Sequence, residues 1–309
     1  MNLLSSPRSL LPPDAELDCS KYKCWKITGL LPWASIIFIG GFAMREVGAY
    51  HYNDLGIYIA SVVLLLAAPP VYAAADYFIL GRTLYYIPYL SPIHPGRVVS
   101  TFIGVDVIIE ILTGNGAAKL ANSSLSPTSI RIGRDMIRAS LILQVILFFC
   151  FVILAAQFHR QCHKAGVVTP KIRTIMVVLY VSSVLILVRS IYRTVEFFEG
   201  YTGYIYRTEP FFWVFEASLM FINSVVLNIW HPARYLPRSN KCYLSRDGVT
   251  ERMGPGWVDK RPFIVTVLDP FDIAGLIKGR DKETAFWDLP EQQQEASQGD
   301  APKPEHAPV

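Results

Sequence analysis

Residues 189–232 read RSIYRTVEFFEGYTGYIYRTEPFFWVFEASLMFINSVVLNIWHP, and this stretch decides the fold. Apolar runs lie on both sides of its charged centre, which indicates that a lipid bilayer surrounds it. Arg189, Arg193 and Glu196 recur at i, i+4 and i+7, so they share one face of a predicted helix.

The residues that follow this face add further candidates. Gly200 and Gly203 break the predicted helix, Glu209 precedes a second apolar run, and Glu216 lies within that run. Ionisable groups at membrane depth are costly and normally face a bundle interior or a wet cavity. We therefore expect the rest of the chain to form the helix bundle into which these side chains point.

The composition agrees with a membrane protein. Of the 309 residues, 52% are hydrophobic and only 17% are charged, and the mean hydropathy is +0.32. The net charge of +4 is too small to indicate a nucleic-acid partner. The sequence contains no Gly-rich phosphate loop, nucleophile elbow or HExxH motif, so we expect neither an enzyme nor a cofactor.

Six apolar runs are long enough to cross the hydrocarbon, which takes about 20 residues. The predicted fold class is therefore all-α, a polytopic transmembrane helix bundle with six visible spans. Pro69 and Pro70 predict a kink in the second span. The spans are Ile27–Met44, Ile57–Leu80, Val98–Ala118, Ala139–Phe158, Ile172–Val195 and Phe211–Ile229.

Basic residues beside the spans predict the orientation. An even number of spans places both termini on one side, which carries fourteen Lys or Arg residues against seven on the other. Both termini should therefore be cytoplasmic. The sequon Asn122-Ser123-Ser124 then falls on the outer side, where glycans are added.

Three regions follow from this orientation. Residues 1–26 form a polar cytoplasmic tail, residues 27–235 form the bundle, and residues 236–309 form a largely disordered cytoplasmic tail. Within the last region, Phe263–Ile277 is more apolar, and we expect it to lie at the membrane surface or against the bundle.

Polar residues inside the spans allow more than one interpretation. Asp106 and Glu110 lie one helical turn apart, so they form either a proton or substrate-amine site or a structural pair bonded to another helix. Arg189, Arg193 and Glu196 could pair only to stiffen their helix. His159, Cys162 and His163 have helical spacing that suits a metal, but no matching further ligands are visible, so no metal site is expected.

The segment R-x3-R-x2-E-x3-G-x2-G-x5-E-x6-E, from Arg189 to Glu216 and followed by His231-Pro232, resembles the fungal lipid-translocating exporter family. Weaker matches run through residues 27–235, among them Glu46-x-Gly48-x-Tyr50, Ala68-Pro69, Tyr77, Asp106, Gly116 and Gln144. Family members usually have seven predicted spans, and the first is not visible here. Glu110 stands where the family usually has an apolar residue, and Glu216 replaces an Asp.

The resemblance implies transport of amphipathic lipids, namely sphingoid long-chain bases or sterol-like toxicants, with a link to stress or drug resistance at the plasma membrane. The expected partners are thus membrane lipids or amphipathic small molecules. The matching site residues are Glu46, Asp106, Arg189, Arg193, Glu196, Gly200, Gly203, Glu209, Glu216 and His231, to which Glu110 is added from its position.

A physical version of this transport follows from the residues. The amine of a cationic amphiphile could lie against Asp106, Glu110, Glu196 or Glu216 while its chain stays among apolar side chains. The alternative is a membrane receptor or stress sensor that signals through the cytoplasmic tail. An intramembrane zinc hydrolase is a third interpretation, for which His159, His163 and His231 are the only candidate ligands.

Overall fold

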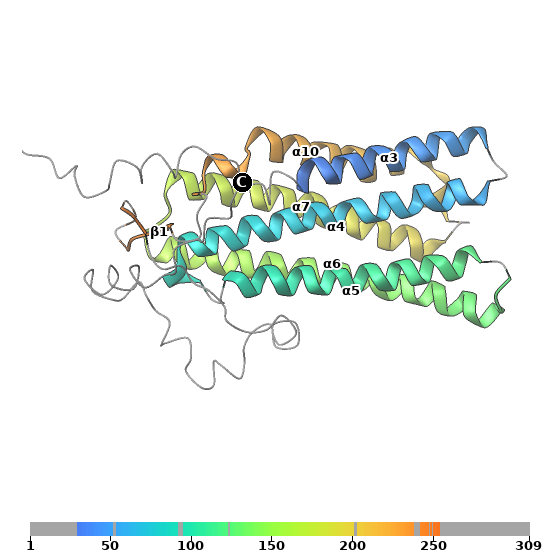
Figure 1. The fold of residues 1–309 in the computed structure, drawn as a ribbon, viewed down its shortest axis with the longest axis horizontal. Helices are drawn as coiled ribbons and strands as arrows, with labels where there is room; N and C mark the ends of the chain where they lie inside the picture. Colours follow the sequence, from blue (N-terminus) through green and yellow to red (C-terminus); the bar gives the residue numbers. More distant parts are fainter. Residues whose placement is uncertain are drawn as a thin grey trace, which may run out of the picture.

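The computed structural model describes residues 30–51, 54–91, 95–122, 124–200, 203–237, 242–246, 248 and 250–253. Residues 1–29 and 254–309 lie outside this part, and with them the predicted N-terminal tail and the apolar segment Phe263–Ile277. The described chain forms a bundle of long helices that run side by side (Figure 1).

Six helical spans in the described chain are long and apolar enough to cross a membrane, which confirms the predicted fold class. The first five are α3 (Leu30–Tyr50), α4 (Leu55–Tyr86), α5 (Pro95–Ala121), α6 (Pro127–Lys164) and α7 (Pro170–Glu199). The sixth joins α9 (Glu209–Phe212), the π-helix η2 (Trp213–Ser218) and α10 (Leu219–Ile229) into one rod. Short elements lie between or after the spans: η1 (Pro88–Leu90), α8 (Tyr204–Arg207), η3 (Pro232–Arg234), β1 (Cys242–Leu244) and β2 (Glu251–Met253).

Capping residues set the starts of three spans. The Asp54 carboxylate accepts from the backbone N–H groups of Gly56 and Ile57 at the start of α4. Ser126 and Thr169 cap α6 and α7 in the same way, each followed by Pro at the first helical position. The Pro69-Pro70 pair lies inside α4, which continues as a helix on both sides of it.

Helices that follow one another in the chain pack as antiparallel neighbours, and α4 also packs against α7. As a result α4 and α7 are the most buried spans. The outward face of α7 carries exposed Val177, Val181, Val184 and Val188, which is the surface expected towards lipid tails.

A short antiparallel hairpin follows the last span, where the sequence predicted a largely disordered tail. β1 pairs with β2, and β1 packs against the end of α4. The Tyr86 hydroxyl donates to Glu251 Oε1 at 2.8 Å, and the Tyr89 hydroxyl donates to the Ser245 carbonyl at 3.1 Å. The hairpin therefore lies at the end of the bundle opposite the α5–α6 loop (Figure 1).

Candidate functional site

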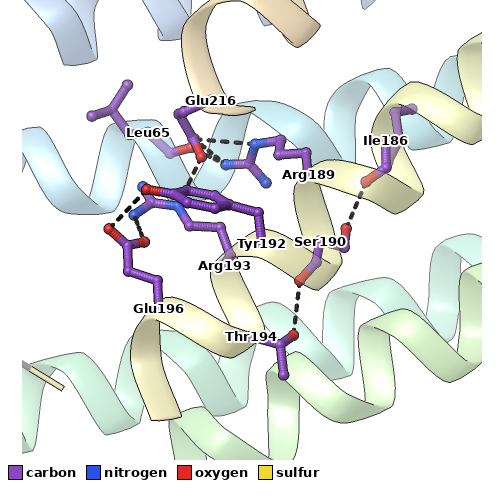
Figure 2. Close-up of polar contacts among 9 residues, drawn as sticks. All are labelled: Leu65, Ile186, Arg189, Ser190, Tyr192, Arg193, Thr194, Glu196 and Glu216. Carbon is purple, nitrogen blue, oxygen red and sulfur yellow. Dashed lines mark hydrogen bonds and ion pairs between the residues drawn. The ribbon is translucent and has the colours of Figure 1, made fainter. Parts of the chain in front are cut away.

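The candidate site begins on the inward face of α7. Arg189 and Glu196 are buried and Arg193 is half-buried, so the predicted shared face points into the bundle. Glu216 reaches this face from η2 and is fully buried. Its Oε1 accepts from both Nε and Nη2 of Arg189, the former at 3.1 Å (Figure 2).

Arg193 extends the same network outward along α7. Its Nε forms an ion pair with Glu216 Oε2 at 2.8 Å, and its Nη1 donates to Glu196 Oε2 at 2.7 Å. Two guanidinium groups thus face two carboxylates, Glu196 and Glu216, and the network is electrically balanced. We call Arg189, Arg193, Glu196 and Glu216 the ion cluster. Its pairing crosses between two spans, so it does more than stiffen one helix.

A backbone carbonyl on α4 completes the coordination of Arg189. Nη2 of Arg189 donates to the Leu65 carbonyl at 2.9 Å. In an α-helix this carbonyl would accept from the N–H of residue 69, but residue 69 is a proline and has none. Pro69 therefore leaves a carbonyl free inside the bundle, and the guanidinium occupies it.

Aromatic rings surround the outer part of the ion cluster. Tyr192 stacks on Phe215 with 5.4 Å between ring centroids. The Phe212 ring lies between two cations, 3.9 Å from the Arg45 guanidinium carbon and 5.8 Å from that of Arg193. These contacts hold η2 against α7 and α9 against α3.

The π-helix explains how Glu216 reaches the cluster. A π-helical turn carries one more residue than an α-helical turn, and such turns are frequent at functional sites. Here the wide turn covers Trp213–Ser218 and contains Glu216. The only sign of this π-helix in the sequence was an acidic residue within an apolar run.

A second polar region lies on α5 and differs in its pairing. Asp106 is only 7% exposed, and its Oδ2 makes no hydrogen bond to any of the residues that the structure describes. The Tyr77 hydroxyl of α4 is close enough to interact with this carboxylate, yet it too makes no well-formed hydrogen bond within the described chain. The Tyr77 ring is held by Phe102 and Phe151, with centroids 5.2 and 4.9 Å away.

Glu110 lies one turn further along α5 and is half-buried. Its carboxylate interacts with the charge of Arg189 and with that of Asp106, but no ion pair of Glu110 is formed within the described part of the chain. We call Asp106 and Glu110 the acid pair. The acid pair lies beside the ion cluster, and neither of its two acids forms an ion pair with a described residue.

Other predicted site residues lie away from both groups. Glu46 is exposed on α3, and Glu209 is exposed at the start of α9. His231 is half-buried beyond the far end of the sixth span, and burial, with a smaller contribution from Arg234, lowers its pKa. None of the three contacts the ion cluster in the described structure.

The two glycines shape the turn between spans. α7 ends at Glu199, and Gly200 caps it with a φ of +73°, a conformation that favours glycine. A Cβ on Gly203 would lie 2.6 Å from the Glu199 Cβ, so the chain can pass there only without a side chain. The pair thus turns the chain back so that η2 lies along α7.

The structure also brings in residues that sequence reasoning missed. Leu65, Pro69 and Tyr77 take part in the site, whereas the sequence pointed to Pro69 only as a kink and a family match and to Tyr77 only as a family match. Asn223 lies seven residues after Glu216 on the buried face of α10, and neither atom of its amide is hydrogen-bonded to a described residue. The sequence signal that could have identified Asn223 was an amide in an apolar run, seven residues after Glu216.

Among the described residues, no group of three or more His, Cys, Asp or Glu is arranged to hold a metal ion.

These features define the class: a helical, multi-pass membrane protein whose described part contains six helical spans, with charged groups buried between its helices. The RTA1-like protein family model matches residues 33–239, and the chain belongs to this family.

Several curated proteins are similar to it. Two are named lipid-translocating exporter-like protein RTA1. The one from Leptosphaeria maculans is 35% identical over 289 residues (86% of this chain, 55% of the relative). The one from Ajellomyces capsulatus is 37% identical over 273 residues (84% and 85%). Protoporphyrin uptake protein 1 of Saccharomyces cerevisiae is 34% identical over 226 residues (69% and 73%).

The chain spans only about half of the Leptosphaeria maculans relative's length. No solved structure matches the chain. The family model and these relatives confirm the family that the Arg189–Glu216 segment predicted.

Proposed function

We propose that this protein is a transporter, not an enzyme, and that it moves amphipathic lipids with a cationic headgroup across the bilayer. Sphingoid long-chain bases, which carry an amine on a long hydrocarbon chain, are the substrate class we favour, and a role in resistance to sterol-like toxicants would follow from the same chemistry. The relatives named as lipid-translocating exporters support the lipid part of this proposal.

One observation carries the cationic part. The four members of the ion cluster neutralise one another, whereas Asp106 and Glu110 have no ion-pair partner among the described residues. Fully ionised, the acid pair gives this part of the interior a net negative charge. A buried negative charge needs a cation nearby, and an amine headgroup supplies it. A dianionic substrate such as a porphyrin would be repelled by the same acids.

The experiment is reconstitution into liposomes with a labelled long-chain base, and the variants are Asp106→Asn and Glu110→Gln. A hydrogen bond to a charged group is worth about 1.5 to 3 kcal/mol, so we expect each variant to weaken substrate binding about ten- to a hundredfold. Glu209→Gln is the matched control, since it removes an exposed acid from the sixth span.

Unchanged transport by both acid-pair variants at normal protein levels would reject the assignment of the amine site. A wild-type protein that moves no long-chain base above the rate of empty liposomes would reject the substrate class as a whole.

A receptor or stress sensor is the second candidate, and the β1–β2 hairpin favours it. The hairpin connects the segment after the last span to α4, the helix that also contributes Leu65 to the site. A chain ending at Pro237 would lack the hairpin, and a chain ending at Met253 would retain it. A transporter should keep its efflux in the longer truncation, whereas a sensor that signals through residues 254–309 should lose its output in both.

We also propose a plasma-membrane location with cytoplasmic termini. Asn122 is exposed in the α5–α6 loop, at the end of the bundle opposite the hairpin. With this orientation the protein expressed in fungal cells should carry a glycan that a glycosidase removes and that Asn122→Gln abolishes. Labelling of the hairpin end from outside intact cells would contradict the orientation.

A further inference from the structure

A further acidic side chain, besides the four acids of the two groups above, lies inside the bundle. Asp76 of α4 is fully buried, and so is its partner Ser182 of α7. Ser182 Oγ lies 2.9 Å from Asp76 Oδ1 and 2.8 Å from Oδ2. No other hydrogen bond or ion pair reaches this carboxyl from the described residues.

The two short distances bear on where the proton is. A serine hydroxyl has one proton, so it can donate fully to only one carboxylate oxygen. If Asp76 carries a proton, its own O–H donates to Ser182 Oγ while the Ser182 hydroxyl donates to the other oxygen. The protonated acid therefore makes both contacts hydrogen bonds, and the ionised acid does not.

Among the described residues, the helices packed against α4 form no ion pair with Asp76, and the buried Arg97 of α5 lies nine residues before Asp106, near the start of that helix. On α7 the nearest basic residue of the same face is Arg189, about 10 Å further along the helix and already bound to Glu216 and Leu65. α5 presents Asp106, whose carboxylate interacts with Tyr77, the residue next to Asp76. The ionisable residues of α3 in the described chain are Arg45, Glu46 and Tyr50, all at its opposite end.

At its own end of α4, Asp76 is followed by Arg82, whose Nη1 donates to the Pro237 carbonyl at 3.1 Å, and by Tyr86, which binds Glu251. These groups belong to the hairpin end and lie more than one turn away along the helix. An isolated carboxylate in such surroundings is so costly that the group keeps its proton instead.

We propose that Asp76 is a proton-binding site that couples lipid transport to proton movement. The inference rests on the proposed function and adds its energy source. When the bundle opens, the Asp76 O–H bond breaks and the proton passes to water on one side. The bond forms again with a proton from water on the other side. The interior thus holds either a proton on Asp76 or the cationic headgroup beside the acid pair, and one exchanges for the other.

α7 provides the mechanical connection. Ser182, Arg189 and Glu196 are spaced by seven residues and lie on the same buried face of this helix. Loss of the Asp76 proton removes one of the two hydrogen bonds between Asp76 of α4 and Ser182 of α7. Because the Arg189–Leu65 bond joins the same two helices about two turns away, movement of α7 reaches the ion cluster and the acid pair.

The test uses the full-length protein in liposomes that contain a pH-sensitive dye, with a labelled long-chain base as substrate. With a pH difference of about one unit, one-for-one exchange predicts about tenfold accumulation of the base, because each corresponds to 1.4 kcal/mol. The dye should also report proton movement when the base is added at equal pH.

Asp76→Asn keeps the size and the hydrogen-bonding capacity of the side chain but cannot release a proton. Because the amide resembles the protonated acid, we expect this variant to bind the headgroup less tightly and to lose both the accumulation and the dye response, while its folding, followed by size-exclusion chromatography, stays like that of the wild type. Asp54→Asn is the matched control, because it changes an exposed acid at the start of the same helix to another good capping residue.

Accumulation by Asp76→Asn at the wild-type level would overturn the proposal. A wild-type protein that exchanges the base but shows no dye response would also overturn the proposal while leaving lipid transport intact. This outcome is measured on the wild type alone, so it does not depend on whether a variant folds. If the wild type exchanges no base even at equal pH, the proposed function and the proton coupling fall together.

Discussion

The two polar regions inside the bundle both contain carboxylates at membrane depth, yet they differ in how these carboxylates are paired. In the ion cluster, Glu216 forms ion pairs with both guanidinium groups, and Glu196 forms an ion pair with Arg193. In the acid pair, Asp106 is as deeply buried as Glu196 but has a carboxylate oxygen without a described hydrogen bond. A buried charge in a membrane protein therefore indicates a ligand site only when its partner is missing.

This comparison narrows the mechanism suggested by the sequence. From the sequence, four acids were candidate partners of a substrate amine, namely Asp106, Glu110, Glu196 and Glu216. Two of them are already occupied by arginines, so a substrate amine would have to displace an ion pair to reach them. We therefore assign the structural role to the ion cluster and the binding role to the acid pair. Three predictions test this division, and a fourth concerns His231, which lies outside both groups.

Glu216→Gln should have the largest effect on stability. It leaves two buried guanidinium groups without their shared carboxylate, and removing one partner of a buried ion pair costs about 3 to 5 kcal/mol. Thermal unfolding in detergent, followed by size-exclusion chromatography, should show a large loss of folded protein. Glu209→Gln, an exposed acid of the same span, should behave like the wild type, and equal melting of the two variants would refute the structural role.

Pro69→Ala tests the connection between α4 and Arg189. The new N–H competes for the Leu65 carbonyl, so the hydrogen bond from the charged guanidinium, worth about 1.5 to 3 kcal/mol, is exchanged for a backbone bond of about 1 kcal/mol. Relative to Pro70→Ala, which removes the same kind of helix-interior proline, we expect a loss of about 0.5 to 2 kcal/mol in the free energy of unfolding. Pro70→Ala is the control, because it restores a bond to residue 66 and should not destabilise; the reverse order would disprove the explanation.

Asp106→Asn should change stability by no more than about 1 kcal/mol, because the amide replaces a carboxylate that has no cationic partner to lose. The same variant should lose substrate binding, so stability and transport separate at this position. The measurement is thermal unfolding beside the liposome assay. A drop in melting temperature as large as that of Glu216→Gln would move Asp106 into the structural group and end the distinction between the two regions.

His231 should give the smallest effect, and only in acid. Its pKa is lowered in the folded protein by burial and by Arg234, so the unfolded chain binds more protons as pH falls. The stabilising contribution of neutral His231 is thus present above the ordinary histidine pKa and is lost as pH drops through the lowered value. His231→Gln should flatten the dependence of melting temperature on pH in that range, and an unchanged slope would show that other groups cause it.

Much of the architecture could be predicted because membrane crossing leaves a strong local signal. The apolar runs marked all six spans, and the structure extends most of them into polar residues that hydropathy alone excludes, as α6 does from Pro127 to Arg138. The spacing of Arg189, Arg193 and Glu196 correctly predicted a shared inward face. The glycine pair correctly predicted the end of α7.

Partner choice could not be predicted in the same way. Glu216 meets Arg189 across two helices, and Ser182 meets Asp76 across a separation of 106 residues. The role of Pro69 depends on which side chain approaches the carbonyl it frees. The hairpin was missed because its strands are only three residues long, and a polar tail with turn residues resembles a disordered one.

The sequence by itself determined that this chain lies in a membrane, how many times the described part can cross it and which residues would be expensive there. Those properties depend on hydrophobicity and on the spacing of residues within one helix. Only the tertiary structure decided which of the expensive residues neutralise one another and which remain available. That outcome depends on how helices distant in the chain pack together, because a charge between helices is balanced or left open by the neighbour it meets.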